Sequence, residues 1–168
     1  GVNSVGVDLS SVSSAGSAGG VSATMSGKVS SAGDASTGVK LVSDAASNAG
    51  AIDLFVGGSL AVSGVGAQAA MLRSTSRDGT AGNVAVTLGA DLLVLGEGAK
   101  GLVASTSGAV SAGSVVLTAA GDMRIDGVNS VGVDLSSVSS AGSAGGVSAT
   151  MSGKVSSAGD ASTGVKLV

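Results

Sequence analysis

The first 42 residues of the chain, "GVNSVGVDLSSVSSAGSAGGVSATMSGKVSSAGDASTGVKLV", return without a change at residues 127–168. The 168 residues therefore hold one period of 126 residues and the first third of the next period. Repetition at a fixed period is typical of arrays in which each unit packs on the one before it. We therefore expect this sequence to be a window of a longer array.

A second, weaker repeat divides the 126-residue period into four units of 31 or 32 residues. The first eleven positions of the units align without gaps as "GVNSVGVDLSS", "GDASTGVKLVS", "GVGAQAAMLRS" and "GEGAKGLVAST". Their last thirteen positions align as "GVSATMSGKVSSA", "AIDLFVGGSLAVS", "NVAVTLGADLLVL" and "SVVLTAAGDMRID". The length difference falls between these blocks, as expected of a loop. The predicted units are 1–32, 33–63, 64–95, 96–126, 127–158 and a partial unit, 159–168.

Within both blocks apolar residues alternate with polar or mixed ones, which is the period of a strand with one buried face. Aligning the units places the expected inward residues in columns that contain no charged residue. The first strand gives Val7, Val39, Ala70 and Leu102; then Leu9, Leu41, Leu72 and Ala104; then Ser11, Ser43, Ser74 and Thr106. The second strand gives Val21, Ile52, Val84 and Val115; then Ala23, Leu54, Val86 and Leu117; then Met25, Val56, Leu88 and Ala119. The third strand gives Val29, Leu60, Leu92 and Met123; then Ser31, Val62, Val94 and Ile125.

This pattern predicts an all-β fold, a parallel β-solenoid (β-helix) with three short strands in each coil of about 31 to 32 residues. At ordinary strand spacing, coils lie about 4.8 Å apart, so a four-coil period advances roughly 19 Å. Crossovers between parallel strands favour right-handed winding. The absence of proline fits strands that have neighbours on both sides. Opposite charges also share outward columns in adjacent coils, which predicts the pairs Asp8 with Lys40 and Asp122 with Lys154.

The unit "GDASTGVKLVSDAASNAGAIDLFVGGSLAVSG" resembles the β-solenoid passenger or stalk repeats of giant bacterial autotransporters and filamentous-haemagglutinin-type adhesins. The resemblance covers the whole sequence. It implies a secreted protein or one displayed on the bacterial cell surface, acting as a stalk, fibre or adhesin. Repetition without a single change favours a long, uniform fibre.

Little in the sequence points to catalysis or to a cofactor. The chain has no His and no Cys, so imidazole or thiol nucleophiles and the common zinc sites are excluded. Parallel β-helices can carry polysaccharide-cleaving acids along a groove, and the candidate here is the column Lys28, Ser59, Asp91, Asp122 and Lys154. Asp91 and Asp122 could share a proton or bind a cation. The simpler interpretation is a solvated turn, so we expect no enzyme activity, no cofactor and no metal.

Two other surfaces of the predicted solenoid suggest alternative functions, namely ice binding and lateral contact between fibres. Ice binding requires the same residue type on every coil, but the column Thr24, Phe55, Thr87 and Thr118 is interrupted, and its neighbour Ser22, Asp53, Ala85 and Val116 has no Thr. Apolar residues at expected outward positions could form a stripe for lateral contact between fibres, although scattered exposed aliphatic residues are normal on any surface. The residues concerned are Val42, Phe55, Met71, Leu93, Val103 and Val116.

The sequence thus predicts a structural protein, the shaft of an extracellular filament or adhesin stalk. A carbohydrate- or receptor-binding solenoid surface is the alternative, and a β-helix enzyme or an ice-binding solenoid is third. The expected partner is the protein itself, through the same chain continuing along the axis, copies stacking head to tail, or lateral bundling. The net charge of −3 without a basic cluster argues against nucleic acid. No apolar run reaches the about 18 residues of a membrane span.

Overall fold

The computed structural model describes residues 1–168 as an all-β fold of sixteen strands in three parallel sheets. The first sheet contains β1 (Val5–Ser13), β4 (Thr37–Ala45), β7 (Gln68–Ser76), β10 (Lys100–Gly108), β13 (Val131–Ser139) and β16 (Thr163–Leu167). The second contains β2 (Val21–Met25), β5 (Ile52–Val56), β8 (Val84–Leu88), β11 (Val115–Ala119) and β14 (Val147–Met151). The third contains β3 (Val29–Ser31), β6 (Leu60–Val62), β9 (Leu92–Val94), β12 (Met123–Ile125) and β15 (Val155–Ser157). The structure contains no helix that could span a membrane.

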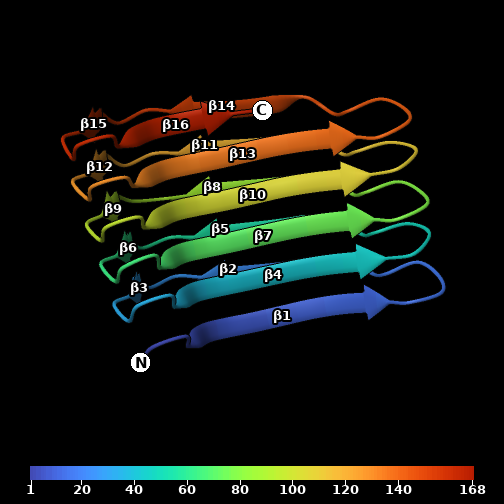
Figure 1. The fold of residues 1–168 in the computed structure, drawn as a ribbon, viewed down its shortest axis with the longest axis horizontal. Helices are drawn as coiled ribbons and strands as arrows, with labels where there is room; N and C mark the ends of the chain where they lie inside the picture. The colour runs from blue at the N-terminus through green and yellow to red at the C-terminus, as the bar shows by residue number, and fades with distance from the viewer.

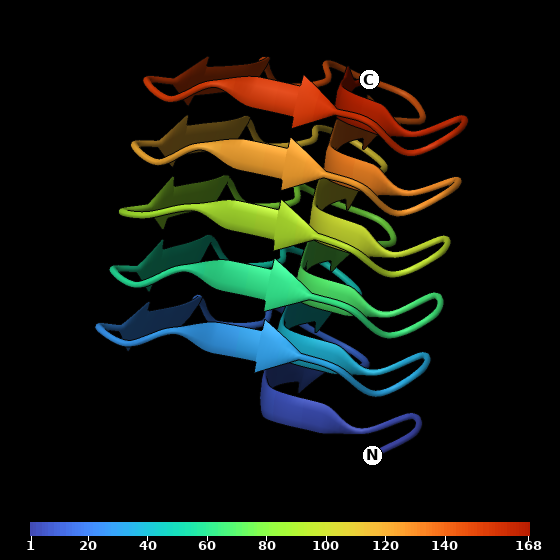
Figure 2. The ribbon, with the colours of Figure 1, turned by 90° about the vertical axis from the view of Figure 1, so that its left-hand side faces the viewer.

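The chain visits the three sheets in turn and then begins the next layer, so each strand inside a sheet pairs with the strand one coil below it and the strand one coil above it (Figure 1). Figure 2 shows the coils stacked in one column, with the two chain termini at opposite ends of the stack. This architecture confirms the predicted parallel β-solenoid with three strands in each coil.

The predicted register is confirmed in all three sheets. In the first sheet Val7 lies beside Val39, Val39 beside Ala70, and Ala70 beside Leu102. The other inward columns of the second and third sheets are paired in the same way. Register is fixed because a slip of one residue would move every apolar side chain to the outer face.

The interior is a stack of aliphatic side chains that is closed in the middle coils and open at the ends. Leu41, Ile52, Leu72, Leu102 and Leu117 have no exposed surface. Burying such a side chain contributes about 1.5–3 kcal/mol. Each added coil therefore contributes a similar stabilisation by burial. The end coils lack part of this stabilisation because one of their faces has no neighbouring coil.

The hydroxyl column forms a ladder that joins consecutive coils. Ser43 Oγ accepts the N–H of Gly50 in its own coil at 2.8 Å and donates to the carbonyl of Gly19 in the preceding coil at 3.0 Å. Ser74 repeats the arrangement with Gly82 and Gly50. These bonds satisfy buried backbone groups at the corner between the first and second sheets, where sheet hydrogen bonding ends.

One turn residue in every coil adopts the left-handed conformation just before the first-sheet strand. Glycine occupies it at Gly66 and Gly98, both with φ of 61°. Asn3 and Asn129 occupy it with φ of 54°, and asparagine tolerates this region. Alanine stands there at Ala35 and Ala161, with φ of 51° and 53°. These two alanines pay a conformational cost that glycine would avoid.

Candidate functional site

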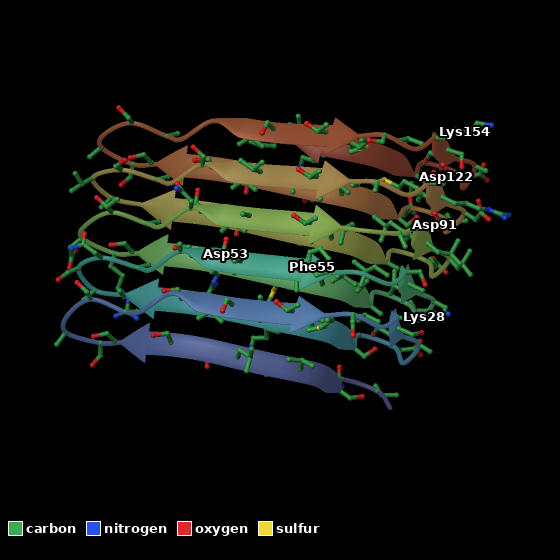
Figure 3. All side chains as sticks on the ribbon, turned by 180° about the vertical axis from the view of Figure 1, so that it is seen from behind. Lys28, Asp53, Phe55, Asp91, Asp122 and Lys154 are labelled. Carbon is green, nitrogen blue, oxygen red and sulfur yellow. The ribbon has the colours of Figure 1, made fainter.

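The structure brings all five residues of the charged turn column together in one groove. The column, defined as Lys28, Ser59, Asp91, Asp122 and Lys154, follows the turn between the second and third sheets of successive coils. Figure 3 shows its four charged members along one edge of the stack. The groove has a volume of about 450 Å³, and its other lining residues include Ala61, Leu93 and Arg124 from the outer face of the third sheet.

The two aspartates of the column hold neighbouring coils together. Asp91 Oδ1 accepts the backbone N–H of Asp122 at 2.8 Å. Asp122 Oδ1 accepts the backbone N–H of Lys154, one coil further, also at 2.8 Å. Each carboxylate therefore replaces a sheet hydrogen bond at a turn, where the backbone has no strand partner.

The expected charge pairs have different outcomes. Lys40 Nζ lies 2.9 Å from Asp8 Oδ2, so the first pair is confirmed. Asp122 and Lys154 are adjacent, but the carboxylate bonds the backbone of Lys154 and no ion pair forms between the side chains. The prediction of a second ion pair was wrong, because a short aspartate at a turn reaches the nearby N–H of the next coil. Exposed pairs such as Asp8 with Lys40 contribute at most about 1 kcal/mol.

Arg124 is the other charged side chain of the groove, and it is held by an acid of its own strand end. Its guanidinium lies 2.6 Å from Asp126 Oδ2. The hydrogen bond from Arg124 to this carboxylate, together with the charge of Asp126, raises the pKa of Arg124. The arginine therefore remains a fixed positive charge at the edge of the groove.

No other acidic cluster accompanies Asp91 and Asp122. No group of three or more His, Cys, Asp or Glu side chains is close enough to hold a metal ion. The groove therefore presents two carboxylates that each bond backbone, flanked by cationic side chains. This mixture of charges and apolar patches can contact a polar, extended ligand.

Sequence reasoning missed that acceptor side chains bridge the coils at several turns. Asp34 Oδ1 accepts the N–H of Val65 at 2.9 Å. Asn48 Oδ1 accepts that of Thr80 at 3.1 Å, and Asn83 Oδ1 that of Ser114 at 2.9 Å. The available signal was that every one of these Asp or Asn residues lies in a connection between strands, where such side chains often bond nearby backbone.

The six outward apolar residues do not form a single stripe, because they lie on three sheets. Phe55 and Val116 belong to the second sheet and are 43% and 42% exposed. Met71 and Val103 are neighbours on the first sheet and are half-buried, and Leu93 lies on the third sheet. Val42 is only 7% exposed.

Val42 points outward from β4, but its neighbours cover it. Its partner in the next strand is Arg73, whose guanidinium reaches Asp44 at 3.7 Å. Val42 is thus flanked by Arg73 in the next coil and is almost fully buried. A side chain that is only 7% exposed offers little surface for contact with another fibre.

The threonine column of the second sheet is aligned as the sequence indicates. Thr24, Phe55, Thr87 and Thr118 are successive register partners, with Phe55 interrupting the hydroxyl surface. Phe55 lies on the open face of this sheet, away from the charged turn column (Figure 3).

Three comparisons with known proteins returned no relative: no protein-family model, no curated protein and no solved structure matches the chain. The function of the chain must therefore be inferred from the solenoid and its surfaces.

Proposed function

We propose that the chain is a structural repeat region that forms the shaft of an extracellular filament or adhesin stalk. The observation that carries the proposal is the uninterrupted stack of three parallel sheets over a core that repeats along one axis. Backbone hydrogen bonds of all three sheets run along that axis, so they resist both bending and extension. A shaft needs this stiffness and needs no reactive group.

The surface supports a mechanical role more than a catalytic one. The chain offers no imidazole or thiol, and Asp91 and Asp122 each bond backbone of the next coil. We infer that the protein is not an enzyme and uses no cofactor. Its partner is then the protein itself, either as the same chain continuing along the axis or as further copies. The location at a bacterial surface is proposed from the resemblance to autotransporter and haemagglutinin-type repeats.

Electron microscopy of the native material, combined with fibre diffraction, tests this proposal. A shaft gives thin unbranched fibres with layer lines at about 4.8 Å and an axial repeat of about 19 Å. Discrete globular particles would contradict the proposal.

A second candidate function, binding of a carbohydrate or receptor, is favoured by the groove of the charged turn column. Its length across several coils, its volume of about 450 Å³ and its mixed charges suit an extended polar ligand. A glycan array probed with the 168-residue chain separates the two functions. A shaft leaves the array blank, whereas binding that is lost with Lys28→Ala and Lys154→Ala together would favour the groove.

A further inference from the structure

The outer face of the second sheet carries almost no charge. Each of its strands β2, β5, β8, β11 and β14 points two side chains outward. One outward column is Ser22, Asp53, Ala85, Val116 and Ser148, and the other is Thr24, Phe55, Thr87, Thr118 and Thr150. Asp53 is the only charged residue in the two columns, whereas the outer face of the first sheet carries ion pairs such as Lys40 with Asp8. Little charge therefore opposes the close approach of another sheet to this face.

The same face has two projecting apolar side chains and a hollow. Phe55, the single aromatic residue of the chain, is 43% exposed and Val116 is 42% exposed. They belong to different columns and lie two coils apart. A hollow of about 160 Å³ lies beside Phe55 and Asp53, which Figure 3 shows on this open face, and its floor includes the small residues Ser22 and Ala85. The face therefore has both a projection and a space into which a projection of similar size could fit.

We propose that this face binds the same face of a second copy that runs parallel to it. The two copies are related by a half-turn about an axis along the stack and by an advance of two coils. The half-turn places each column of one copy across from the other column of its partner. The advance then sets Phe55 across from Val116 and Asp53 across from Thr118. The remaining facing pairs are Thr24 with Ala85 and Ser22 with Thr87, and the inference adds this lateral contact to the proposed role as a shaft.

Other symmetric arrangements of the two faces pair the side chains less well. A half-turn without an advance would set the ring of Phe55 across from the carboxylate of Asp53 and bury that charge against an apolar group. Copies that run in opposite directions place each column across from itself, so Phe55 would not meet Val116. Of these arrangements, only the advance of two coils pairs the large apolar side chains and also gives Asp53 a hydroxyl donor. Two coils are half of the 126-residue period, so in a repeating array both copies make the same contacts.

The area of this contact grows with the number of stacked coils. A strand of five residues is about 17 Å long and four coils are about 19 Å high, so each 126-residue period offers about 320 Å² of this face. Stable interfaces bury at least about 1,200 Å² over both partners, which takes about two periods. Lateral pairing is therefore stable along a shaft, and the 168-residue chain shows it as a weak association that depends on concentration.

Sedimentation equilibrium of the 168-residue chain measures this association, and a pair of serine substitutions tests the apolar contact. Phe55→Ser and Val116→Ser remove two sides of the same contact. We expect each to weaken association about fivefold, and the double variant to weaken it no more than either alone. Val138→Ser is the matched control, since Val138 is 50% exposed on the first sheet and should leave association unchanged.

A pair of lysine substitutions in one column tests the relative position of the copies. Thr118→Lys sets a cation across from Asp53 of the second copy, whereas Thr150→Lys, one coil further, sets it across from Ala85. Both variants have the same net charge. We expect Thr118→Lys to tighten association about fivefold and Thr150→Lys to weaken it. The gain of Thr118→Lys should disappear when Asp53→Asn is added or when salt of about 1 M screens the charges.

The substituted side chains all point away from the core, so an unchanged circular dichroism spectrum shows that each variant is folded. Equal effects of the two lysines, or additive losses from Phe55→Ser and Val116→Ser, would overturn the arrangement. A chain that stays single at about 1 mM would also overturn it, as would association that Phe55→Ser leaves unchanged. Each of these results would leave the proposed shaft intact, because the shaft is tested by the axial repeat of the fibre.

Discussion

Leu9 and Leu135 occupy the same position of two identical 42-residue segments, yet Leu9 is 40% exposed and Leu135 is completely buried. The difference comes from the coil beneath: Leu135 lies on Ala104 of β10, and Leu9 has no strand below it. Within residues 1–168 the burial of the same local sequence therefore depends on whether a coil lies beneath it.

This relationship predicts unequal costs for the same substitution. Leu135→Ala leaves a cavity between coils and should lower the free energy of unfolding by about 2–5 kcal/mol. Leu9→Ala removes a partly exposed side chain at an open end and should cost about 1 kcal/mol. Urea unfolding followed by circular dichroism measures both variants. Equal costs would mean that the end coil is as well covered as the interior.

The hydroxyl ladder predicts a contrast between Ser74 and Thr106. Ser74→Ala leaves the Gly82 N–H and the Gly50 carbonyl without their partner in a buried position, and should cost about 2–4 kcal/mol. Thr106 departs from the ladder and donates to the Gly113 carbonyl, which also accepts from Ser137. Thr106→Val keeps the shape and leaves that carbonyl bonded, so we expect a cost below about 1 kcal/mol. Thermal unfolding of the two variants compares them, and a larger loss for Thr106→Val would contradict the ladder.

The left-handed alanine predicts a stabilising change. Ala35→Gly should raise the free energy of unfolding by up to about 1 kcal/mol, because glycine adopts positive φ without the steric cost of a Cβ. Ala32→Gly serves as the control, since Ala32 has no positive φ and the added chain entropy should destabilise slightly. A melting temperature that falls for both variants would show that Ala35 carries no conformational cost.

Asp91 accepts a backbone hydrogen bond from the next coil, so we expect its acceptor oxygen to contribute to stability and its negative charge to contribute little. Asp91→Asn retains an oxygen for the N–H of Asp122, as Asn48 and Asn83 provide at other turns, and should change stability by less than about 0.5 kcal/mol. Asp91→Ala leaves that N–H without a protein partner and should cost about 1 kcal/mol. Chemical denaturation of the two variants distinguishes them. A large cost for Asp91→Asn would instead indicate that the negative charge of the carboxylate itself stabilises this turn.

The solenoid, its three strands in each coil and the register of the buried columns can all be predicted from the amino-acid sequence. They are predictable because apolar residues alternate with period two and because units of 31 or 32 residues repeat this alternation in the same places. The charged turn column was also predictable as a group, since stacking in register brings equivalent positions together.

The contacts and the exposure of individual side chains became known from the folded structure. It showed that Asp122 bonds the backbone of Lys154 and that Val42, on the outer face of β4, is only 7% exposed. It also showed that the apolar outward residues are divided among three sheets. It also showed that Leu9 is partly exposed and Leu135 is buried, although their local sequences are identical. The physical reason is that periodicity fixes which way a side chain points, whereas its exposure and its partners depend on the coil above and the coil below.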